Sequence, residues 1–333
     1  MEFKQHYSLE NLNTFQLPVI ARWFVEYENE DALEVILNGS FFHEQRSLHI
    51  GRGSNMLFLN DFEGVILHSS MRTVVKVEET GNSVLLRIGA GKIWDDVVAV
   101  AADNGWWGIE NLSLIPGETG AAAVQNIGAY GVEIKDVIET VVAYHKKTSE
   151  KRVFSNAECE YGYRRSVFKS DNYIITYVFI RLQKNPVYHL DYGNLREVLG
   201  STEALTIKKV RDAVISIRRQ KLPDPAKLPN AGSFFMNPIV TQDRFEQLHE
   251  NYPDMPHFAV NNGNIKLSAG WLIEQCGLKG KRMGAVGTYE QNALVIVNHG
   301  GASGREIAKF ASYIQQTVQQ VFDIELTPEV KYV

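Results

Sequence analysis

The most informative segment of the chain is IPGETGAAAVQNIGAYG, residues 115–131, here called the cradle loop. It contains four glycines and three consecutive alanines, so it offers little side-chain volume to a hydrophobic core. Glycines and small residues let a ligand approach the backbone, and successive N–H groups form a nest for phosphate oxygens. A second segment, GRGSNM at residues 51–56, here called the GRG loop, follows a predicted strand that ends at Ile50. The cradle loop predicts a ligand site, whereas the GRG loop alone is either a plain turn or a phosphate loop.

Several common catalytic and nucleotide-binding motifs are absent from the sequence. Met56 stands where a Rossmann loop has its third glycine, and Gly89-Ala90-Gly91-Lys92 continues with Ile93, not with the serine or threonine of a P-loop. No HExxH motif is present and the nine histidines lack ligand spacing, so no metal site is expected. No GxSxG elbow is present either, which argues against a serine hydrolase.

Composition indicates an ordinary globular protein of 333 residues, of which 44% are apolar and 22% charged. A net charge of −5 argues against a dedicated nucleic-acid binder, which needs clustered lysines and arginines. The two cysteines, Cys159 and Cys276, form no CxxC pair and favour a reducing compartment. Residues 1–6 lack the start of a signal peptide, and no window approaches the roughly 18 to 20 apolar residues of a membrane span. We therefore expect a cytoplasmic protein without nucleic-acid or membrane partners. A monomer is expected as well, although none of these observations bears on the oligomeric state.

Hydrophobic patterning along the chain predicts a mixed α+β protein made of three compact units. Strands are predicted at 65–68, 73–77, 84–88, 137–144, 173–182, 293–298 and 322–332. Helices are predicted at 29–36, 93–102, 207–217, 268–275 and 305–321. The proline-rich segment KLPDP at 221–225 predicts a linker or functional loop, and we place a boundary there.

Three single residues are candidates for chemistry, and each has a simpler explanation. Arg164 either clamps a carboxylate bidentately or lies solvated at the surface. Ser233, between a glycine and two phenylalanines, is either a turn serine or a proton donor in a dry pocket. Glu329, on an otherwise apolar C-terminal strand, either points to solvent or has a function. The residues alone leave these alternatives open and indicate only a ligand-binding α+β protein.

Taken together, the segments resemble the UDP-N-acetylenolpyruvoylglucosamine reductase family, and in particular its longer, type I members. Nine matching segments run in family order from residue 13 to residue 330. They are NTF (13–15), GRGSN (51–55), IPG (115–117), QNIGAYG (125–131), YGYRxSxF (161–168), KLPDP (221–225), NAGSFF (230–235), AGWLI (269–273) and PEV (328–330). Their number and order make the resemblance specific.

The resemblance implies a two-domain FAD-binding fold of the vanillyl-alcohol oxidase type plus a third α+β substrate domain. The expected limits are 1–70 and 71–220 for the two FAD-binding domains and 221–321 for the substrate domain. The C-terminal segment at about 322–333 is expected near the active site. The boundary predicted from the prolines after Lys221 agrees with this plan.

The resemblance also implies the ligands and the residues that hold them. FAD is the expected cofactor and NADPH the expected hydride donor. The residues expected to bind FAD are Gly51, Gly53, Ser54, Asn55, Met56, Pro116, Gly117, Gly120, Ala121, Asn126, Gly128, Ala129 and Arg218. Those expected to contact the substrate are Tyr192, Lys221 and Asn237.

The implied reaction reduces UDP-N-acetylglucosamine enolpyruvate to UDP-N-acetylmuramate, a step of peptidoglycan precursor synthesis. NADPH reduces FAD, and the flavin then passes hydride to C3 of the enolpyruvyl group. Arg164 and Glu329 are expected to stabilise the enolate-like intermediate, Glu329 best when protonated or sharing a proton. Ser233 is expected to deliver the proton to C2 as general acid.

Two positions depart from the family pattern, since Met236 stands where lysine is expected and Tyr289 where histidine is expected. Both bear on contacts with the nucleotide. Two other functions suit the same fold: an FAD-linked oxidase reoxidised by oxygen, and a non-catalytic regulator that binds flavin or a UDP-sugar. The Ser233 and Glu329 segments argue against the oxidase, and the presence of these residues with Arg164 argues against the regulator.

Overall fold

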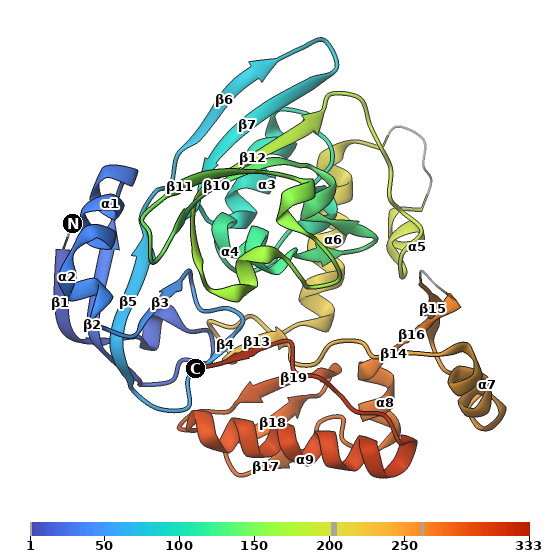
Figure 1. The fold of residues 1–333 in the computed structure, drawn as a ribbon. Coiled ribbons are helices and arrows are strands. Elements are labelled where there is room, and N and C mark those ends of the chain that lie inside the picture. The colour runs from blue at the N-terminus through green and yellow to red at the C-terminus, as the bar shows by residue number, and fades with distance from the viewer. Residues whose placement is uncertain (1, 201–204, 261–262) are drawn as a thin grey trace. The chain divides into compact units, whose positions relative to one another are not determined.

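The computed structural model describes residues 2–200, 205–260 and 263–333, whose helices and strands are drawn in Figure 1. Helices and mainly antiparallel sheets are mixed along the chain, which confirms the α+β class. Contacts divide the chain into two compact units. Unit 1 comprises Met1–Ser8, Ile20–Gly53 and Phe62–Arg218, and unit 2 comprises Leu9–Val19, Ser54–Asp61 and Arg219–Val333. The three-domain limits near residues 70 and 220 stay a prediction.

Unit 1 begins with a four-stranded sheet in the order β1-β2-β5-β3. Its strands are β1 (Glu2–Ser8), β2 (Ile20–Tyr27), β3 (Ser47–Ile50) and β5 (Phe62–Ser69). Both β2 and β3 run parallel to β5, which is buried along nearly its whole length, as is typical of a parallel strand covered on both faces. The helices α1 (Glu30–Asn38) and α2 (Ser40–His43) follow β2. Asn29 caps α1 by accepting a hydrogen bond from the backbone N–H of Ala32 at 2.8 Å.

A five-stranded antiparallel sheet in the order β11-β10-β12-β7-β6 forms the larger framework of unit 1. Its strands are β6 (Val74–Glu79), β7 (Ser83–Gly89), β10 (Ile138–His145), β11 (Lys151–Ser155) and β12 (Tyr173–Gln183). The helices α3 (Trp94–Asp103) and α4 (Thr119–Gln125) share its core, where the fully buried Trp94 donates its indole N–H to the carbonyl of Leu112 at 3.0 Å. The remaining elements are β8 (Gly128–Ala129), β9 (Val132–Glu133), α5 (Leu195–Leu199) and α6 (Ile207–Lys221).

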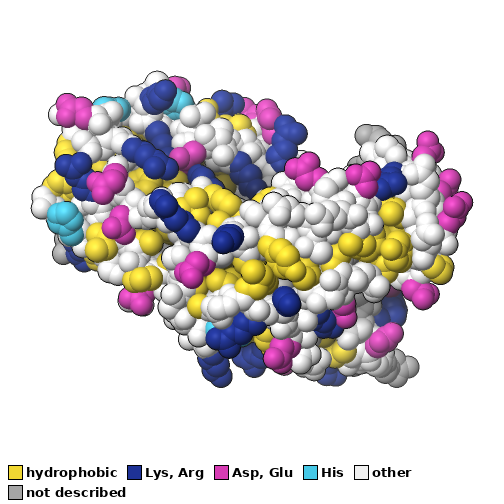
Figure 2. Space-filling model, turned by 90° about the horizontal axis from the view of Figure 1, so that it is seen from below, with side chains coloured by type: hydrophobic (Ala, Val, Ile, Leu, Met, Phe, Trp, Pro, Cys, Tyr) yellow, Lys and Arg dark blue, Asp and Glu magenta, His cyan; other side chains and the backbone are white. Residues whose placement is uncertain are grey.

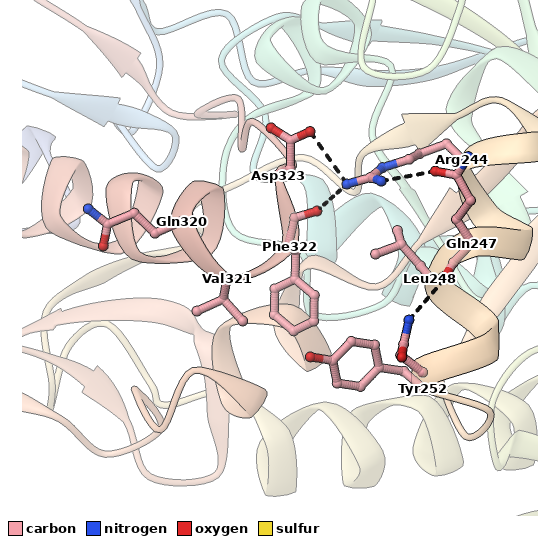
Figure 3. A pocket seen from close by; sticks show the side chains of 9 residues that line it. Arg244, Gln247, Leu248, Tyr252, Gln320, Val321, Phe322 and Asp323 are labelled. Atoms are coloured by element: carbon pink, nitrogen blue, oxygen red, sulfur yellow. Dashed lines mark hydrogen bonds and ion pairs between the residues drawn. The ribbon is translucent and has the colours of Figure 1, made fainter.

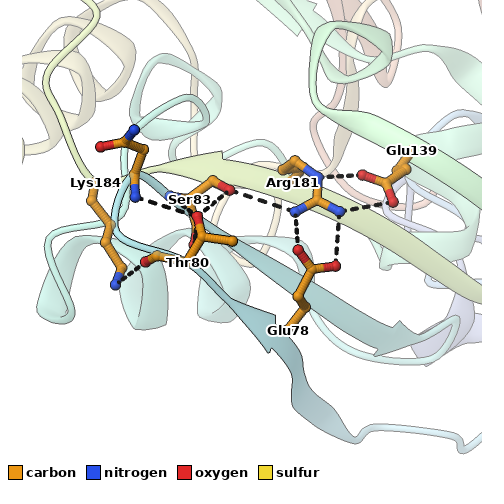
Figure 4. A network of polar contacts seen from close by, with 7 residues as sticks. Glu78, Thr80, Ser83, Glu139, Arg181 and Lys184 are labelled. Carbon is orange, nitrogen blue, oxygen red and sulfur yellow. Dashed lines mark hydrogen bonds and ion pairs between the residues drawn. The ribbon is translucent and has the colours of Figure 1, made fainter.

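Arg181 on β12 links three strands of this sheet (Figure 4). Its guanidinium donates to both carboxylate oxygens of Glu139 on β10, with Nη2 at 3.0 Å from Oε1. It also donates to both oxygens of Glu78 on β6, at 3.2 and 3.3 Å. These side chains are partly exposed, so water screens their attraction and we expect a modest contribution to stability.

Unit 2 is built on a four-stranded antiparallel sheet in the order β13-β19-β18-β17. Its strands are β13 (Asn230–Ser233), β17 (Arg282–Met283), β18 (Val286–Tyr289) and β19 (Asn292–Asn298), and it packs against α8 (Ala269–Gln275) and α9 (Gly304–Phe322). Ser303 and Glu306 form a capping box at the start of α9. The smaller elements are α7 (Gln242–Asn251), the sheet of β14 (Ile239–Val240), β16 (Ile265–Leu267) and β15 (His257–Ala259), and the parallel pair β4 (Met56–Leu57) and β20 (Lys331–Tyr332).

The predicted helices are all confirmed, close to their predicted limits. The predicted strand at 322–332 is wrong, because Phe322 ends α9 and only Lys331–Tyr332 is strand. Asp323 stops the helix in the left-handed conformation, with φ of 51°, and Pro328 lacks the N–H that a regular ladder needs. The hydrophobic pattern also did not predict β1 or β2. For β1 the reason is that it is an edge strand with mostly polar, exposed residues.

The surface carries charges of both signs. Figure 2 shows one face of the molecule, where apolar side chains gather in patches and basic and acidic side chains are both present. Within residues 2–200, 205–260 and 263–333, no helix is long and apolar enough to cross a bilayer.

Candidate active site

The cradle loop in unit 1 owes its shape to residues that tolerate unusual backbone conformations. Gly117 has φ of 126°, a region that favours glycine, and Asn126 ends α4 in the left-handed conformation with φ of 48°. Gly120 faces Ala90 so closely that a Cβ on it would lie 2.8 Å from the Ala90 methyl. Pro116 and Ala121 remain exposed. The loop therefore has one tightly packed side and one accessible side. Contacts between this loop and FAD stay a prediction.

The side chain of Asn126 is fully buried and ties the cradle loop to two other segments. Its amide donates to Oε2 of Glu133 at 3.0 Å and to the carbonyl of Gly162 at 2.8 Å. Its Oδ1 accepts from the backbone N–H of Lys135 at 3.2 Å. Because these hydrogen bonds use the side-chain amide within the protein, Asn126 fixes the shape of the loop. Its backbone carbonyl is the group that contacts Arg164.

Arg164 is held by the cradle loop and is not a freely solvated surface arginine. Its Nη2 donates to the carbonyl of Gly128 at 2.9 Å, and its Nη1 donates to the carbonyl of Asn126 at 3.4 Å. Its backbone adopts φ of 54°, which turns the chain at this residue. The neighbouring Arg165, by contrast, has a side chain that is 73% exposed. The structure therefore fixes a half-buried guanidinium beside the strand β8.

Arg218, near the end of α6, has a buried Nε with no hydrogen-bond partner in the described part of the chain. Burial lowers the pKa of its guanidinium, while Tyr130 and Asp95 partly offset that effect. Asp95 itself is bound by Arg211, with N–O distances of 2.7 and 2.9 Å. A buried guanidinium N–H without an acceptor is costly, so Arg218 fits a site for an anionic ligand.

In unit 2, the chain segments that carry Ser233 and Glu329 pair with each other. The backbone N–H of Glu329 donates to the carbonyl of Phe234 at 2.8 Å, and Phe235 and Pro328 form a β-bridge. The amide of Asn55, in the GRG loop, donates to the carbonyl of Glu329 at 3.2 Å. Three residues predicted for one site, Asn55, Ser233 and Glu329, are thus brought together although they are far apart in sequence.

Ser233 ends β13, where it lies opposite Val295 on β19. The turn before it is held by Asn230, whose Oδ1 accepts from the backbone N–H of Gly232 at 2.8 Å. Gly232 has φ of 69°, a region that favours glycine. Thr14, whose carbonyl accepts from the backbone N–H of Asn230 at 3.0 Å, carries a buried hydroxyl without a partner among the described residues. The serine is thus half-buried on a well-fixed backbone.

Comparison with known proteins identifies the family of this chain. The model of the UDP-N-acetylenolpyruvoylglucosamine reductase C-terminal domain matches residues 224–333, and that of an FAD binding domain matches residues 21–146. The UDP-N-acetylenolpyruvoylglucosamine reductase of Porphyromonas gingivalis is 48% identical over 100% of both chains. That of Bacteroides fragilis is 45% identical over 99% of this chain and 100% of its own. The chain belongs to the UDP-N-acetylenolpyruvoylglucosamine reductase family.

The fold of a solved structure agrees with this assignment. The crystal structure of UDP-N-acetylenolpyruvylglucosamine reductase (MurB) from Thermus caldophilus has a TM-score of 0.70 and covers 99% of this chain and 98% of its own, at 23% identity. The family resemblance expected from the nine sequence segments is therefore confirmed, as are the FAD-binding fold and the oxidoreductase class.

The remaining residues predicted for the reductase site lie in different environments. Gly53 is buried with φ of 60°, whereas Gly51, Ser54, Met56, Gly128 and Ala129 are half-buried. Lys221 is exposed at the end of α6, and Tyr192 meets the ring of Tyr130 edge-on at 6.4 Å. Asn237 uses its Oδ1 to accept from the backbone N–H of Ala269 at 3.0 Å, which orients the start of α8. The roles of all these residues stay a prediction.

The sequence did not predict a group of charged residues in which His68 contacts the cradle loop. His68 on β5 contacts Glu118 in the cradle loop at 3.2 Å and Glu26 on β2 at 2.8 Å. No motif links these residues, because their positions are set by neighbouring strands. The one available signal is Glu118 itself, an acidic side chain within a loop predicted to hold an anion.

An open pocket of about 600 Å³ in unit 2 contains none of the predicted site residues (Figure 3). It lies between α7 and the end of α9. Arg244 in its wall donates to the carbonyl of Phe322 at 2.7 Å and to Gln247 at 3.1 Å, and it pairs with Asp323 at 3.5 Å. The charge of this arginine is compensated within the protein, so the pocket offers no evident chemistry.

Proposed function

We propose that this protein reduces UDP-N-acetylglucosamine enolpyruvate to UDP-N-acetylmuramate with NADPH, through bound FAD, in peptidoglycan precursor synthesis. Its membership in the reductase family and the FAD-binding domain at residues 21–146 support the proposal. NADPH and nucleotide sugars are metabolites of the cytoplasm, so the proposal places the protein in the cytoplasm. We also propose that it acts as a monomer on a small-molecule substrate.

Residues of unit 1 fit the anionic part of FAD. Gly53 and Gly117 carry no side chain and adopt positive φ, a backbone conformation found in loops that bind phosphate oxygens through their N–H groups. Arg218 supplies a buried N–H that lacks an acceptor among the described residues. We therefore assign the anionic part of FAD to Arg218 and to the backbone of the GRG and cradle loops. FAD held there would supply the hydride-transfer chemistry of the reaction, with NADPH as the hydride donor and C3 of the enolpyruvyl group as the acceptor.

Arg164 and Glu329 are assigned to the charge that develops on the substrate. The carbonyls of Gly128 and Asn126 fix the planar guanidinium of Arg164, which suits bidentate binding of the substrate carboxylate. Glu329 assists as a protonated or proton-sharing carboxyl group, because a bare carboxylate would repel the developing negative charge. Both groups act by stabilising the intermediate more than the substrate.

Ser233 is assigned as the proton donor to C2. A hydroxyl group is a weak acid, so it donates usefully only to a strongly basic intermediate and only from a fixed position. The hydrogen bond from Gly232 to Asn230 and the pairing with Val295 provide that fixed backbone. After it gives up its proton, the serine regains one from solvent before the next cycle.

One observation carries this assignment most directly, namely the pairing of residues 234–236 with residues 327–329. The N–H of Glu329 donates to the carbonyl of Phe234 at 2.8 Å. The proposed proton donor Ser233 and the carboxyl group of Glu329 are therefore carried by adjacent segments. The same segment accepts the amide of Asn55 from the GRG loop.

An anaerobic absorbance experiment on the purified protein tests the proposed function. We expect a flavin band that NADPH bleaches and that UDP-N-acetylglucosamine enolpyruvate then restores rapidly. A flavin that NADPH reduces but only oxygen reoxidises would indicate an oxidase of the same fold. A bound flavin that NADPH does not bleach would indicate a regulator, and absence of flavin would overturn the proposal.

A further inference from the structure

A buried imidazole in unit 1 lies between two carboxylates. His68 on β5 is only 3% exposed, and its Nδ1 lies 2.8 Å from Oε1 of Glu26 while its Nε2 lies 3.2 Å from Oε1 of Glu118. A neutral imidazole has one N–H and can donate to only one of them, whereas an imidazolium donates to both. The geometry therefore favours the charged ring.

The groups around His68 agree with a positive charge at this position. Burial lowers the pKa of His68, but the hydrogen bonds and charges of Glu118 and Glu26 raise it, and the pKa ends above its ordinary value. Two further titratable rings lie nearby. His49 on β3 has its pKa lowered to about 3 by burial, by Lys146 and by His68 itself. Tyr27 on β2, whose hydroxyl lies 2.9 Å from Nε2 of His49, has its pKa raised by burial and by Glu118. His68 thus faces carboxylates from β2 and the cradle loop, and a neutral imidazole from β3.

Glu118 connects this imidazole to both predicted cofactor loops. It belongs to the cradle loop and directly precedes α4, yet its side chain does not cap that helix. Instead, its carboxylate reaches the GRG loop, where a Cβ on Gly51 would lie 3.0 Å from Oε2 of Glu118. A carboxylate at this place repels an anionic ligand unless a neighbouring positive charge balances it.

We propose that His68 and Glu118 form a charge-balanced positioning pair beside the GRG loop and the cradle loop, which makes FAD retention depend on the charge of His68. The pair rests on the proposed function, since it concerns FAD. Neither residue is assigned a contact with the cofactor or substrate, and both act through the loops.

The sign of the expected pH dependence follows from the direction of the pKa change. A histidine whose pKa is raised in the folded protein contributes fully below its ordinary value, about 6.5, and loses that contribution as the pH rises through the folded-state value. Above that value, the carboxylate of Glu118 is no longer balanced, and it repels an anionic ligand at the loops. FAD should therefore bind more weakly at alkaline pH.

The experiment measures the dissociation constant of FAD between about pH 6 and about pH 9, from flavin fluorescence released on dilution of the purified holoprotein. We expect the natural protein to lose affinity with rising pH. His68→Gln should weaken binding by about tenfold at the lower pH and remove the pH step. Glu118→Gln, which keeps the side-chain shape without the charge, should retain FAD and also remove the step.

The double variant His68→Gln with Glu118→Gln separates charge balance from packing. It should bind FAD more tightly than His68→Gln alone, because the unbalanced carboxylate is gone. His43→Gln, at an exposed histidine of α2, is the matched control and should behave as the natural protein. If His68→Gln does not fold, the pH dependence of the FAD dissociation constant of Glu118→Gln still tests the proposal.

Two results would overturn the pair while leaving the proposed function intact. One is an unchanged pH step in Glu118→Gln, and the other is a double variant that binds FAD no better than His68→Gln. Failure of the natural protein to bind FAD at any pH would instead overturn the proposed function, and the pair with it.

Discussion

The backbone N–H of Glu329 donates a hydrogen bond to the carbonyl of Phe234 at 2.8 Å. This contact pairs the C-terminal segment of the chain with the segment that follows β13, which ends at Ser233. It places a carboxyl group and a hydroxyl group on neighbouring backbone segments within unit 2. Proton delivery and charge stabilisation at one substrate require such closeness.

Ser233→Ala should separate the two half-reactions. Flavin reduction by NADPH should stay nearly intact, while reoxidation by the enolpyruvyl substrate slows by about 10²- to 10⁴-fold, because only the second step needs the proton. Stopped-flow absorbance of the flavin measures both rates. Ser312→Ala, at an exposed serine of α9, is the control. Equal slowing of both half-reactions would contradict the proton-donor assignment.

Glu329→Gln should impair reoxidation less than Glu329→Ala. Glutamine keeps the length of the side chain and can still donate a hydrogen bond to a developing negative charge, whereas alanine cannot. We expect alanine to cost about 10²- to 10³-fold in the rate of reoxidation. Single-turnover measurements compare the two variants with Glu325→Gln, an exposed position on the same segment. A glutamine variant as slow as the alanine variant would argue that an ionised carboxylate is required.

Arg164→Lys should lower kcat/KM for the enolpyruvyl substrate by about 10²-fold, although the positive charge is kept. Lysine cannot reproduce the planar fork, nor both hydrogen bonds to the carbonyls of Gly128 and Asn126. Steady-state kinetics should show this loss without loss of bound flavin. Arg165→Lys, next in the chain but exposed, should leave kcat/KM unchanged. Similar effects of the two substitutions would remove the case for a specific role of Arg164.

Gly304→Ala should destabilise unit 2 even though alanine favours helices by about 1 kcal/mol over glycine. A Cβ on Gly304, in the first turn of α9, would lie 1.8 Å from the carbonyl oxygen of Phe58, which forces the backbone apart. We expect a loss of about 1 to 3 kcal/mol in the free energy of unfolding.

Chemical denaturation of the protein measures this loss, with Gly81→Ala as the matched control. A Cβ on Gly81 would meet no heavy atom within 4 Å, so that substitution should change the free energy of unfolding little. A Gly304→Ala protein as stable as the natural one would show that the contact with Phe58 relaxes without cost.

Features that depend on neighbours along the chain were predictable. The helices α1 and α9 begin where Asn29 and Ser303 cap them, and these residue types favour that position whatever the rest of the fold. The strand predicted at 322–332 failed because alternating apolar residues such as Ile324 and Leu326 are buried without forming a ladder. Hydrophobic alternation reports burial on one side, which an irregular segment also achieves.

The features of the candidate site also fall into two groups, those that could be predicted from the sequence and those that depend on packing. The family, the α+β class and the two glycine loops could be inferred from the chain alone, because they depend on residue types and on their order. The folded structure was needed to show that Arg164 is anchored by Gly128 and that His68 reaches Glu118, which lies 50 residues further along the chain. The folded structure also shows that Asn55 donates a hydrogen bond to the carbonyl of Glu329, 274 residues away. Burial and electrostatic pairing depend on which distant segments share an environment, and this is set by the packing of strands.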